Sequence, residues 1–153
     1  MFFGMVGGPL MPRFLGVDYG SRRIGLAVSD AEARIALPLA TLEGRVADDI
    51  QRILRACQDY EIDAFVVGLP LNMDDSEGPQ AKRSRKFGKA LAEATGRPVH
   101  YWDERLSSFA AKDLLSATRM SHGKRKARLD RVAAQIILQE FLDARPGQDH
   151  CPA

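Results

Sequence analysis

Three acidic positions stand where burial would normally select an apolar or neutral residue. Asp18 follows one apolar run, and Asp103 and Glu104 follow another. Asp130 lies inside the apolar arc of the last expected helix. Carboxylates that gather in a folded chain repel one another and lose hydration, a cost that a divalent cation between them would offset. The sequence therefore predicts a metal-dependent site.

The first two acidic positions also have simpler explanations. Asp18 and Gly20 form an Asp-x-Gly pattern, which makes an ordinary turn but would also leave room for a phosphate or a metal. Asp103 and Glu104 follow an expected parallel strand, at the edge where open α/β sheets usually bind ligands. They could instead be a solvated pair that Arg105 neutralises. Position alone does not decide between these interpretations.

Helical periodicity places Asp130. Asp130 lies on the apolar side of this helix rather than on the opposite, polar side. Glu140 lies on the same apolar side, near the other end of the helix. The small residues Ala133 and Ala134 follow within about one turn, which would leave space for an ion or a substrate backbone. An acid in the first turn of a helix can also simply complement the helix dipole, so both interpretations are kept.

Periodicity and turn residues predict the elements that would position these acids. Strands are expected at 14–17, 24–28, 37–42, 64–67 and 99–102. Helices are expected at about 46–60, 79–95 and 126–144, with another beginning at Ser107 or Ser108. Three consecutive strands followed by strands that alternate with helices predict an α/β fold. Its mixed sheet would be antiparallel on one side, parallel on the other, and covered by helices.

Composition sets the size and class of the molecule. Of 153 residues, 45% are hydrophobic and 27% charged, which is typical of one globular domain with a full core. We expect a single domain at 13–146, a flexible leader at 1–12 in which Met11 could be the true start, and a tail at 147–153. No apolar run reaches membrane-spanning length. The two cysteines lack metal-ligand spacing, which fits a reducing cytoplasm.

Basic residues are concentrated in two segments, although the formal net charge is only +2. One face of the expected helix at 79–95 carries Lys82, Arg83, Arg85, Lys86 and Lys89. The second segment, which we expect to be a loop before the last helix, includes Lys124, Arg125 and Lys126. Either set could be a solvated surface or could contact the phosphodiester backbone of a nucleic acid. Ser76 and the first amides of the helix at 79–95 could also receive a phosphate.

Four short segments of the chain resemble the signature segments of one protein family, YqgF, also called RuvX. They are 14–20 (FLGVDYG), 68–73 (GLPLNM), 103–107 (DERLS) and 130–134 (DRVAA). All four occur in the right order and at fitting separations, and the match spans nearly the whole chain from Arg13. Asp75 departs from the pattern, because the family usually has glycine there, and it adds charge beside the expected phosphate track.

The resemblance implies a ribonuclease H-like fold, whose mixed five-stranded sheet has antiparallel strands 1–3, parallel strands 4–5 and helices on both faces. It implies catalytic carboxylates at Asp18, Glu104 and Asp130, which would hold one or two Mg²⁺ or Mn²⁺ ions. Asp103 is a further candidate metal ligand. We add Asn72, Ser76 and Arg105 to the basic residues above as candidate nucleic-acid contacts.

The activity that the resemblance implies is hydrolysis of phosphodiester bonds in structured nucleic acid, most directly at the 5' end of pre-16S rRNA. The alternative within the family is resolution of four-way Holliday junctions, for which a symmetric homodimer is expected rather than a monomer. The expected partner is therefore structured RNA, or branched or single-stranded DNA. The sequence does not choose between them, because shape readout leaves no simple residue code.

Two other classes of protein fit part of the sequence. An Asp-x-Gly hairpin also opens the actin and sugar-kinase fold, but such enzymes need two such domains and this chain is too short for them. A nucleic-acid-binding module without catalysis is the second alternative, although all the candidate acids are present. Metal-dependent cleavage of RNA or DNA would separate a nuclease from both.

Overall fold

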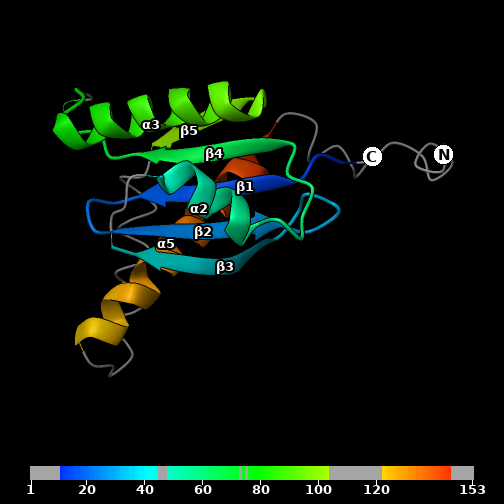
Figure 1. Cartoon of the computed structure of the whole chain (residues 1–153), viewed down its shortest axis with the longest axis horizontal. Helices are drawn as coiled ribbons and strands as arrows, with labels where there is room; N and C mark the ends of the chain where they lie inside the picture. Colours follow the sequence, from blue (N-terminus) through cyan, green and yellow to red (C-terminus); the bar gives the residue numbers. More distant parts are fainter. Residues whose placement is uncertain (1–10, 45–47, 73, 75, 104–121, 146–153) are drawn as a thin grey trace, which may run out of the picture.

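The computed structural model describes residues 11–44, 48–72, 74, 76–103 and 122–145, with the side chains of 122–131 outside the description. Five strands form one sheet in the order β3-β2-β1-β4-β5 (Figure 1). Their bounds are β1 Phe14–Tyr19, β2 Arg23–Ser29, β3 Ala36–Glu43, β4 Ala64–Leu69 and β5 Val99–Asp103.

The central strand β1 joins two differently built halves of the sheet. It pairs antiparallel with β2, which in turn pairs antiparallel with β3. On its other side β1 pairs parallel with β4, and β4 pairs parallel with β5. The predicted mixed sheet, antiparallel in its first three strands and parallel beyond them, is confirmed.

A tight turn connects β1 to β2, as the hairpin pattern predicts. The amide of Gly20 donates to the carbonyl of Arg23 at 2.9 Å and to that of Asp18 at 3.1 Å. A Cβ atom on Gly20 would lie only 2.8 Å from the carbonyl oxygen of Arg23. The turn therefore requires a residue without a side chain at this position.

The two faces of the sheet bury different side chains, because residues alternate along each strand. On one face, Leu15 and Val17 pack with residues of α2 and α3. On the other, Phe14, Ala64 and Val66 pack with α5. We call these the α2/α3 face and the α5 face, and Figure 1 shows α2 in front of the sheet with α5 behind it.

Three helices are described, and their ends follow from the sequence. α2 (Asp49–Ala56) begins after Asp48, whose side chain accepts from the amide of Gln51 at 3.1 Å. α3 (Pro79–Thr95) starts with proline and ends at Gly96, where φ is 70°. α5 spans His122–Ala144. Within the described ranges, none of the helices combines the length and apolar character needed to cross a bilayer.

Three helix boundaries differ from the sequence-based expectation, and one of them is the start of α2, which begins at Asp49 rather than at about residue 46. α5 begins four residues before Lys126, so the prediction of a loop was wrong for Lys124 and Arg125, whose backbone is helical. α2 ends at Ala56 rather than near Tyr60, because the amide of Cys57 closes the helix on the carbonyls of Ile53 and Arg55. Gly123 therefore does not stop α5, and local periodicity overestimated the length of α2.

Candidate active site

Asp18 lies near the carboxyl end of β1 and is partly buried. Phe14 packs on the α5 face, and Gly16 approaches α5 directly. Strand alternation therefore places Asp18, the next even-numbered residue, on the α5 face as well. The predicted catalytic carboxylate thus stands on the central strand, at the edge where the parallel strands end.

Glycines stand beside Asp18 on both neighbouring strands. Gly25 of β2 is its partner in the antiparallel register. On β4, Val67 is level with Val17, so Gly68 follows at the level of Asp18. Alternation puts both glycines on the α5 face, where neither carries a side chain. The carboxylate is therefore flanked on both neighbouring strands by residues that carry no side chain.

α5 crosses β1 in the opposite direction and at close range. Phe14 meets Phe141 with ring centroids 5.2 Å apart. A Cβ atom on Gly16 would lie 2.8 Å from Cβ of Leu138 and 3.1 Å from the carbonyl oxygen of Ala134. The contact thus moves toward the start of α5 as β1 approaches Asp18. Asp130 belongs to the helical turn before Ala134, and its side chain is outside the description.

Asp103 ends β5 at the same edge of the sheet. It is level with Leu69 of β4, and Trp102 is level with Gly68. Because Val99 and Tyr101 pack on the α2/α3 face, alternation assigns Asp103 to that face and away from Asp18. Its role as a metal ligand stays a prediction, as does that of Glu104, which lies outside the described residues.

Tyr19, the residue after Asp18, is held by both helices of the α2/α3 face. Its carbonyl accepts from Nε2 of Gln80 at 2.7 Å, and its ring stacks on Phe87 with centroids 4.1 Å apart. The hydroxyl of Tyr19 contacts Oδ2 of Asp49 at 3.4 Å. Sequence patterns did not identify this anchoring, because residues 19, 49 and 80 belong to three different elements.

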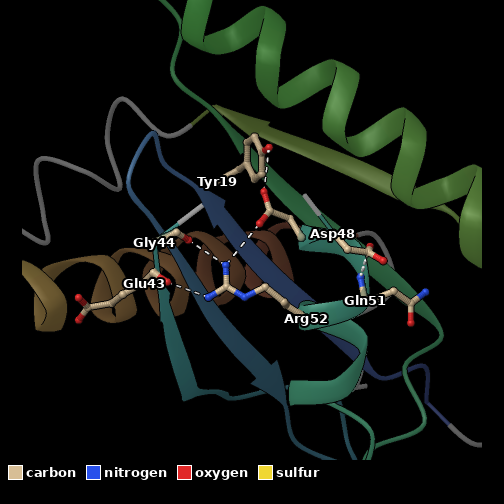
Figure 2. A network of polar contacts seen from close by, with 7 residues as sticks. Tyr19, Glu43, Gly44, Asp48, Gln51 and Arg52 are labelled. Carbon is tan, nitrogen blue, oxygen red and sulfur yellow. Dashed lines mark hydrogen bonds and ion pairs between the residues drawn. The ribbon is translucent and has the colours of Figure 1, made fainter. Parts of the chain in front are cut away.

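A second set of contacts links α2 to the end of β3 (Figure 2). One guanidinium nitrogen of Arg52 donates to the carbonyl of Gly44 at 2.8 Å, and another donates to that of Glu43 at 2.8 Å. The same side chain pairs with Asp49 at 3.4 Å. Through Tyr19 and Asp49, the edge that carries Asp18 is therefore connected to β3 as well as to α3.

The basic face of α3 is exposed, as predicted for Lys82, Arg83, Arg85, Lys86 and Lys89. Nε of Arg85 pairs with Oε2 of Glu77 at 2.6 Å, and its guanidinium lies 5.0 Å from the ring centre of Tyr101. Arg83 donates to Oε1 of Gln80 at 2.8 Å. The three lysines extend the positive surface along the helix, whose first turn lies at the Asp18 edge because Gln80 binds Tyr19.

The loop that leads into α3 is tied together by its own side chains. Nδ2 of Asn72 donates to the hydroxyl of Ser76 at 2.9 Å, and that hydroxyl donates to Oδ1 of Asp74 at 2.6 Å. The bond from the Ser76 side chain, followed by that from its amide, holds the pKa of Asp74 below its ordinary value. Phosphate binding by Asn72 and Ser76 stays a prediction, and the helix cap itself is Gly78, without a side-chain bond.

Of the remaining residues singled out in the sequence, one has a structural partner and the others lie outside the description. Glu140, the second acid in the apolar arc, accepts from Nε1 of Trp102 at 3.2 Å and so has a structural partner. Arg105 lies outside the described residues, as do the side chains of Lys124, Arg125 and Lys126. Position 75 is also outside the description, so the consequence of its aspartate stays a prediction.

Asp18 supplies one carboxylate of the kind that binds a divalent cation. Carboxylate oxygens are the ligands that Mg²⁺ and Mn²⁺ prefer, and the flanking Gly25 and Gly68 would not obstruct an ion. In the described part of the chain, no three His, Cys, Asp or Glu side chains gather as a metal site. That search does not include Glu104 or the side chain of Asp130.

Comparison with known proteins identifies the family. Residues 12–144 match the model of the RuvX family, described as Holliday junction resolvase. A relative from Anaeromyxobacter sp. (strain K) is 47% identical over 134 residues, which cover 87% of this chain and 98% of the relative. One from Chloroflexus aurantiacus (strain J-10-fl) is 45% identical over 140 residues, 89% of this chain and 92% of the relative. Both are provisionally named pre-16S rRNA nucleases.

Solved structures support the same fold. RuvC of T. thermophilus, in complex with a Holliday junction substrate, superposes with a TM-score of 0.56 at 17% identity. The alignment covers 88% of this chain and 96% of RuvC, which establishes a ribonuclease H-like fold. The fold, the order of the four segments and the family match agree, and the chain belongs to the RuvX family.

Proposed function

We propose that this protein hydrolyses phosphodiester bonds in structured nucleic acid, using a divalent ion held by Asp18, Glu104 and Asp130. The observation that carries the proposal is the position of Asp18. It stands near the end of the central strand, between a glycine of β2 and a glycine of β4. It also lies on the face of the sheet that α5 crosses, and α5 contacts β1 at Ala134, one helical turn after Asp130. An acid with only a structural role would not need flanking residues that lack side chains on both neighbouring strands.

The even-numbered positions of β5 give the reason to include Glu104. His100 and Trp102 both pack toward Phe141 on the α5 face, which is the face of Asp18. Alternation continued by one residue would bring position 104 to this face, whereas Asp103 belongs to the other. We therefore favour Glu104 over Asp103 as the ligand that β5 supplies.

The chain's own residues would bind and orient the substrate. Asp18 would fix the position of the ion, and α3 would hold the phosphate backbone through Lys82, Lys86 and Lys89. When bound, the ion would supply an activated water and offset the charge that develops on the scissile phosphate. A diester needs no covalent enzyme nucleophile in this chemistry, so the carboxylates would act as ligands of the ion.

The substrate that we favour is the 5' end of pre-16S rRNA. The relatives that match over nearly their whole length carry the name pre-16S rRNA nuclease. The second candidate is a four-way DNA junction, because the family model is described as Holliday junction resolvase and RuvC was solved with such a substrate. A junction resolvase would be expected to act as a symmetric dimer.

One experiment separates these possibilities. Purified protein with Mg²⁺ or Mn²⁺ is incubated with labelled pre-16S leader RNA, single strands and four-way DNA junctions, and the initial rates are compared. We expect the leader RNA to be cleaved fastest. Faster cleavage of the junction would assign the protein to DNA resolution instead. Binding without cleavage of any substrate would favour the non-catalytic module.

Asp18→Asn tests the assigned chemistry. The amide removes the negative charge that holds the ion. We therefore expect the activation free energy to rise by several kcal/mol, which lowers the cleavage rate roughly a thousandfold. Binding of nucleic acid and the thermal midpoint should change little. Asp59→Asn, an exposed acid at the opposite edge of the sheet, is the matched control. Cleavage at the parent rate by Asp18→Asn would remove this residue from the mechanism.

A further inference from the structure

An open groove of about 610 Å³ runs along the α5 face beside the edge strand β5. Four rings line it, those of Phe14, His100, Trp102 and Phe141, and the guanidinium of Arg145 stands at one end. The groove lies outside the carboxylate site. It has no part in the chemistry described above.

The rings are fixed in different orientations around Phe141. Trp102 meets it edge-on, with centroids 6.2 Å apart and planes at 90°, and His100 lies 5.1 Å away at 39°. The bond from the Trp102 indole to Glu140 holds the largest ring in place. Arg145 lies over the ring of Phe14 at 4.8 Å. This arrangement is a preformed aromatic surface along the wall of the groove.

One end of the groove, at Trp102, lies at the level of the proposed cleavage site, and the rest extends toward the amino ends of β1, β4 and β5. Trp102 is level with Gly68, which is level with Asp18, and both Trp102 and Asp18 belong to the α5 face. Two strand spacings separate them, which amounts to about 10 Å. A strand of nucleic acid whose phosphate lies at Asp18 could therefore place a neighbouring nucleotide over Trp102.

The charges around the groove favour a negatively charged ligand, and its rings favour one that carries aromatic groups. Asp63, an acid of the lining, is paired with Arg97 at 3.9 Å and accepts from the amide of Arg13 at 2.9 Å. Partial burial, with a further effect from the charge of Arg145, lowers the pKa of His100, which favours the neutral form of this ring. Arg145 then supplies positive charge beside neutral aromatic surfaces.

We propose that this groove stacks an unpaired nucleobase from a single-stranded part of the substrate. Aromatic rings and arginine in a positive groove are the surfaces on which proteins stack bases of single strands, whereas bases inside a duplex cannot reach them. The inference rests on the proposed function only in taking nucleic acid as the ligand. It adds that a single-stranded flank next to the scissile bond is part of the recognised substrate.

Trp102 is the only tryptophan of the chain, so its fluorescence reports directly on the groove. The intact protein, with EDTA to prevent cleavage, is titrated with a short single-stranded RNA, with an abasic strand of equal length and with a blunt duplex. We expect saturable quenching by the RNA alone. His100→Ala should raise the dissociation constant about five- to a hundredfold, the range for loss of one stacked base.

Lys86→Ala is the matched control, because Lys86 belongs to the basic surface of α3 on the opposite face. It should weaken binding but leave the quenching at saturation unchanged. Equal quenching by the abasic strand, or none by a strand that binds, would overturn the inference. Quenching that depends on protein concentration alone would assign the groove to a second copy of the chain. If quenching depended on the bases but the protein cleaved no substrate, the stacking inference would stand and the proposed nuclease activity would be wrong.

Discussion

The backbone next to Asp18 is held by a side chain from another element. Gln80 donates to the carbonyl of Tyr19 and accepts from Arg83, so one residue connects β1, which carries Asp18, to the basic helix α3. Catalysis depends on geometry to within about 1 Å. We therefore regard Gln80 as a residue that positions Asp18 without touching the substrate.

Gln80→Glu tests this role, because the carboxylate keeps the size and the acceptor of the glutamine but loses the donor to Tyr19. We expect kcat to fall about tenfold with little change in KM, and more Mg²⁺ to be needed for half-maximal rate. Gln51→Glu, at an exposed site on α2, is the control. If KM alone increased, Gln80 would be assigned to substrate binding.

Asp30 makes stability depend on pH. Burial raises the pKa of its carboxyl, but the backbone bonds from Ile35 and Arg34 outweigh this and leave the pKa below 3.8. A carboxyl with a lowered folded pKa stabilises the protein above its unfolded pKa, and that stability is lost as the pH falls through the folded value. Urea unfolding between pH 6 and pH 2 should show a loss that is smaller in Asp30→Ala. An equal loss in both proteins would contradict this assignment.

At the scale of elements, the close approach of α5 to β1 depends on Gly16. Gly16→Ala would bring a methyl group against Leu138 and Ala134, so the helix must shift or the strand must move. We expect a loss of about 1–3 kcal/mol in unfolding free energy. Cleavage should fall further than stability explains, because α5 carries Asp130.

Gly78→Ala is the matched control for this substitution, since a Cβ atom there would meet Asn72 at an ordinary 3.5 Å. Both variants are compared by urea unfolding and by the rate of cleavage at a temperature where each is fully folded. A Gly16→Ala protein with normal cleavage would show that the spacing between α5 and β1 does not matter for the site.

Sequence patterns predicted the elements where a local signal exists. Pro79 and Gly96 marked both ends of α3, and Gly20 marked the hairpin, because these residues restrict or permit backbone conformations that others do not. The start of α5 was missed, since Gly123 weakens a helix without ending it when the rest of the helix packs on the sheet. Tertiary packing decided that boundary.

At the scale of the whole molecule, charge is distributed unevenly on a chain that is nearly neutral overall. Replacing Lys82, Lys86 and Lys89 together by glutamine should flatten the dependence of binding on salt, because each phosphate contact releases counterions. If all three contact phosphates, the slope of log K against log salt should decrease by about 2 for a single strand and by about 2.7 for a duplex. Arg55→Gln on α2 is a control with an exposed cation on another helix. An unchanged slope would mean that the lysines of α3 are solvated and do not contact phosphates.

The long-range parts of the site could not be predicted from the sequence. Asp18 was identified from its own neighbours, as an acid at the end of an apolar strand. The contacts of Gln80 with Tyr19, and of Trp102 with Glu140, join residues 61 and 38 positions apart. Such pairs depend on strand order and helix register, which appear only when the whole chain has folded.

The two connections that leave the end of the sheet beside Asp18 differ greatly in length. β1 leaves it through a turn of residues 20–22, whereas β4 leaves through residues 70–78. Lengthening or shortening the second connection would change what can approach the edge without moving the hairpin that carries Asp18. Variation of this loop alone would therefore alter which substrate shapes reach that end of the sheet, and the strand that carries Asp18 would remain as it is.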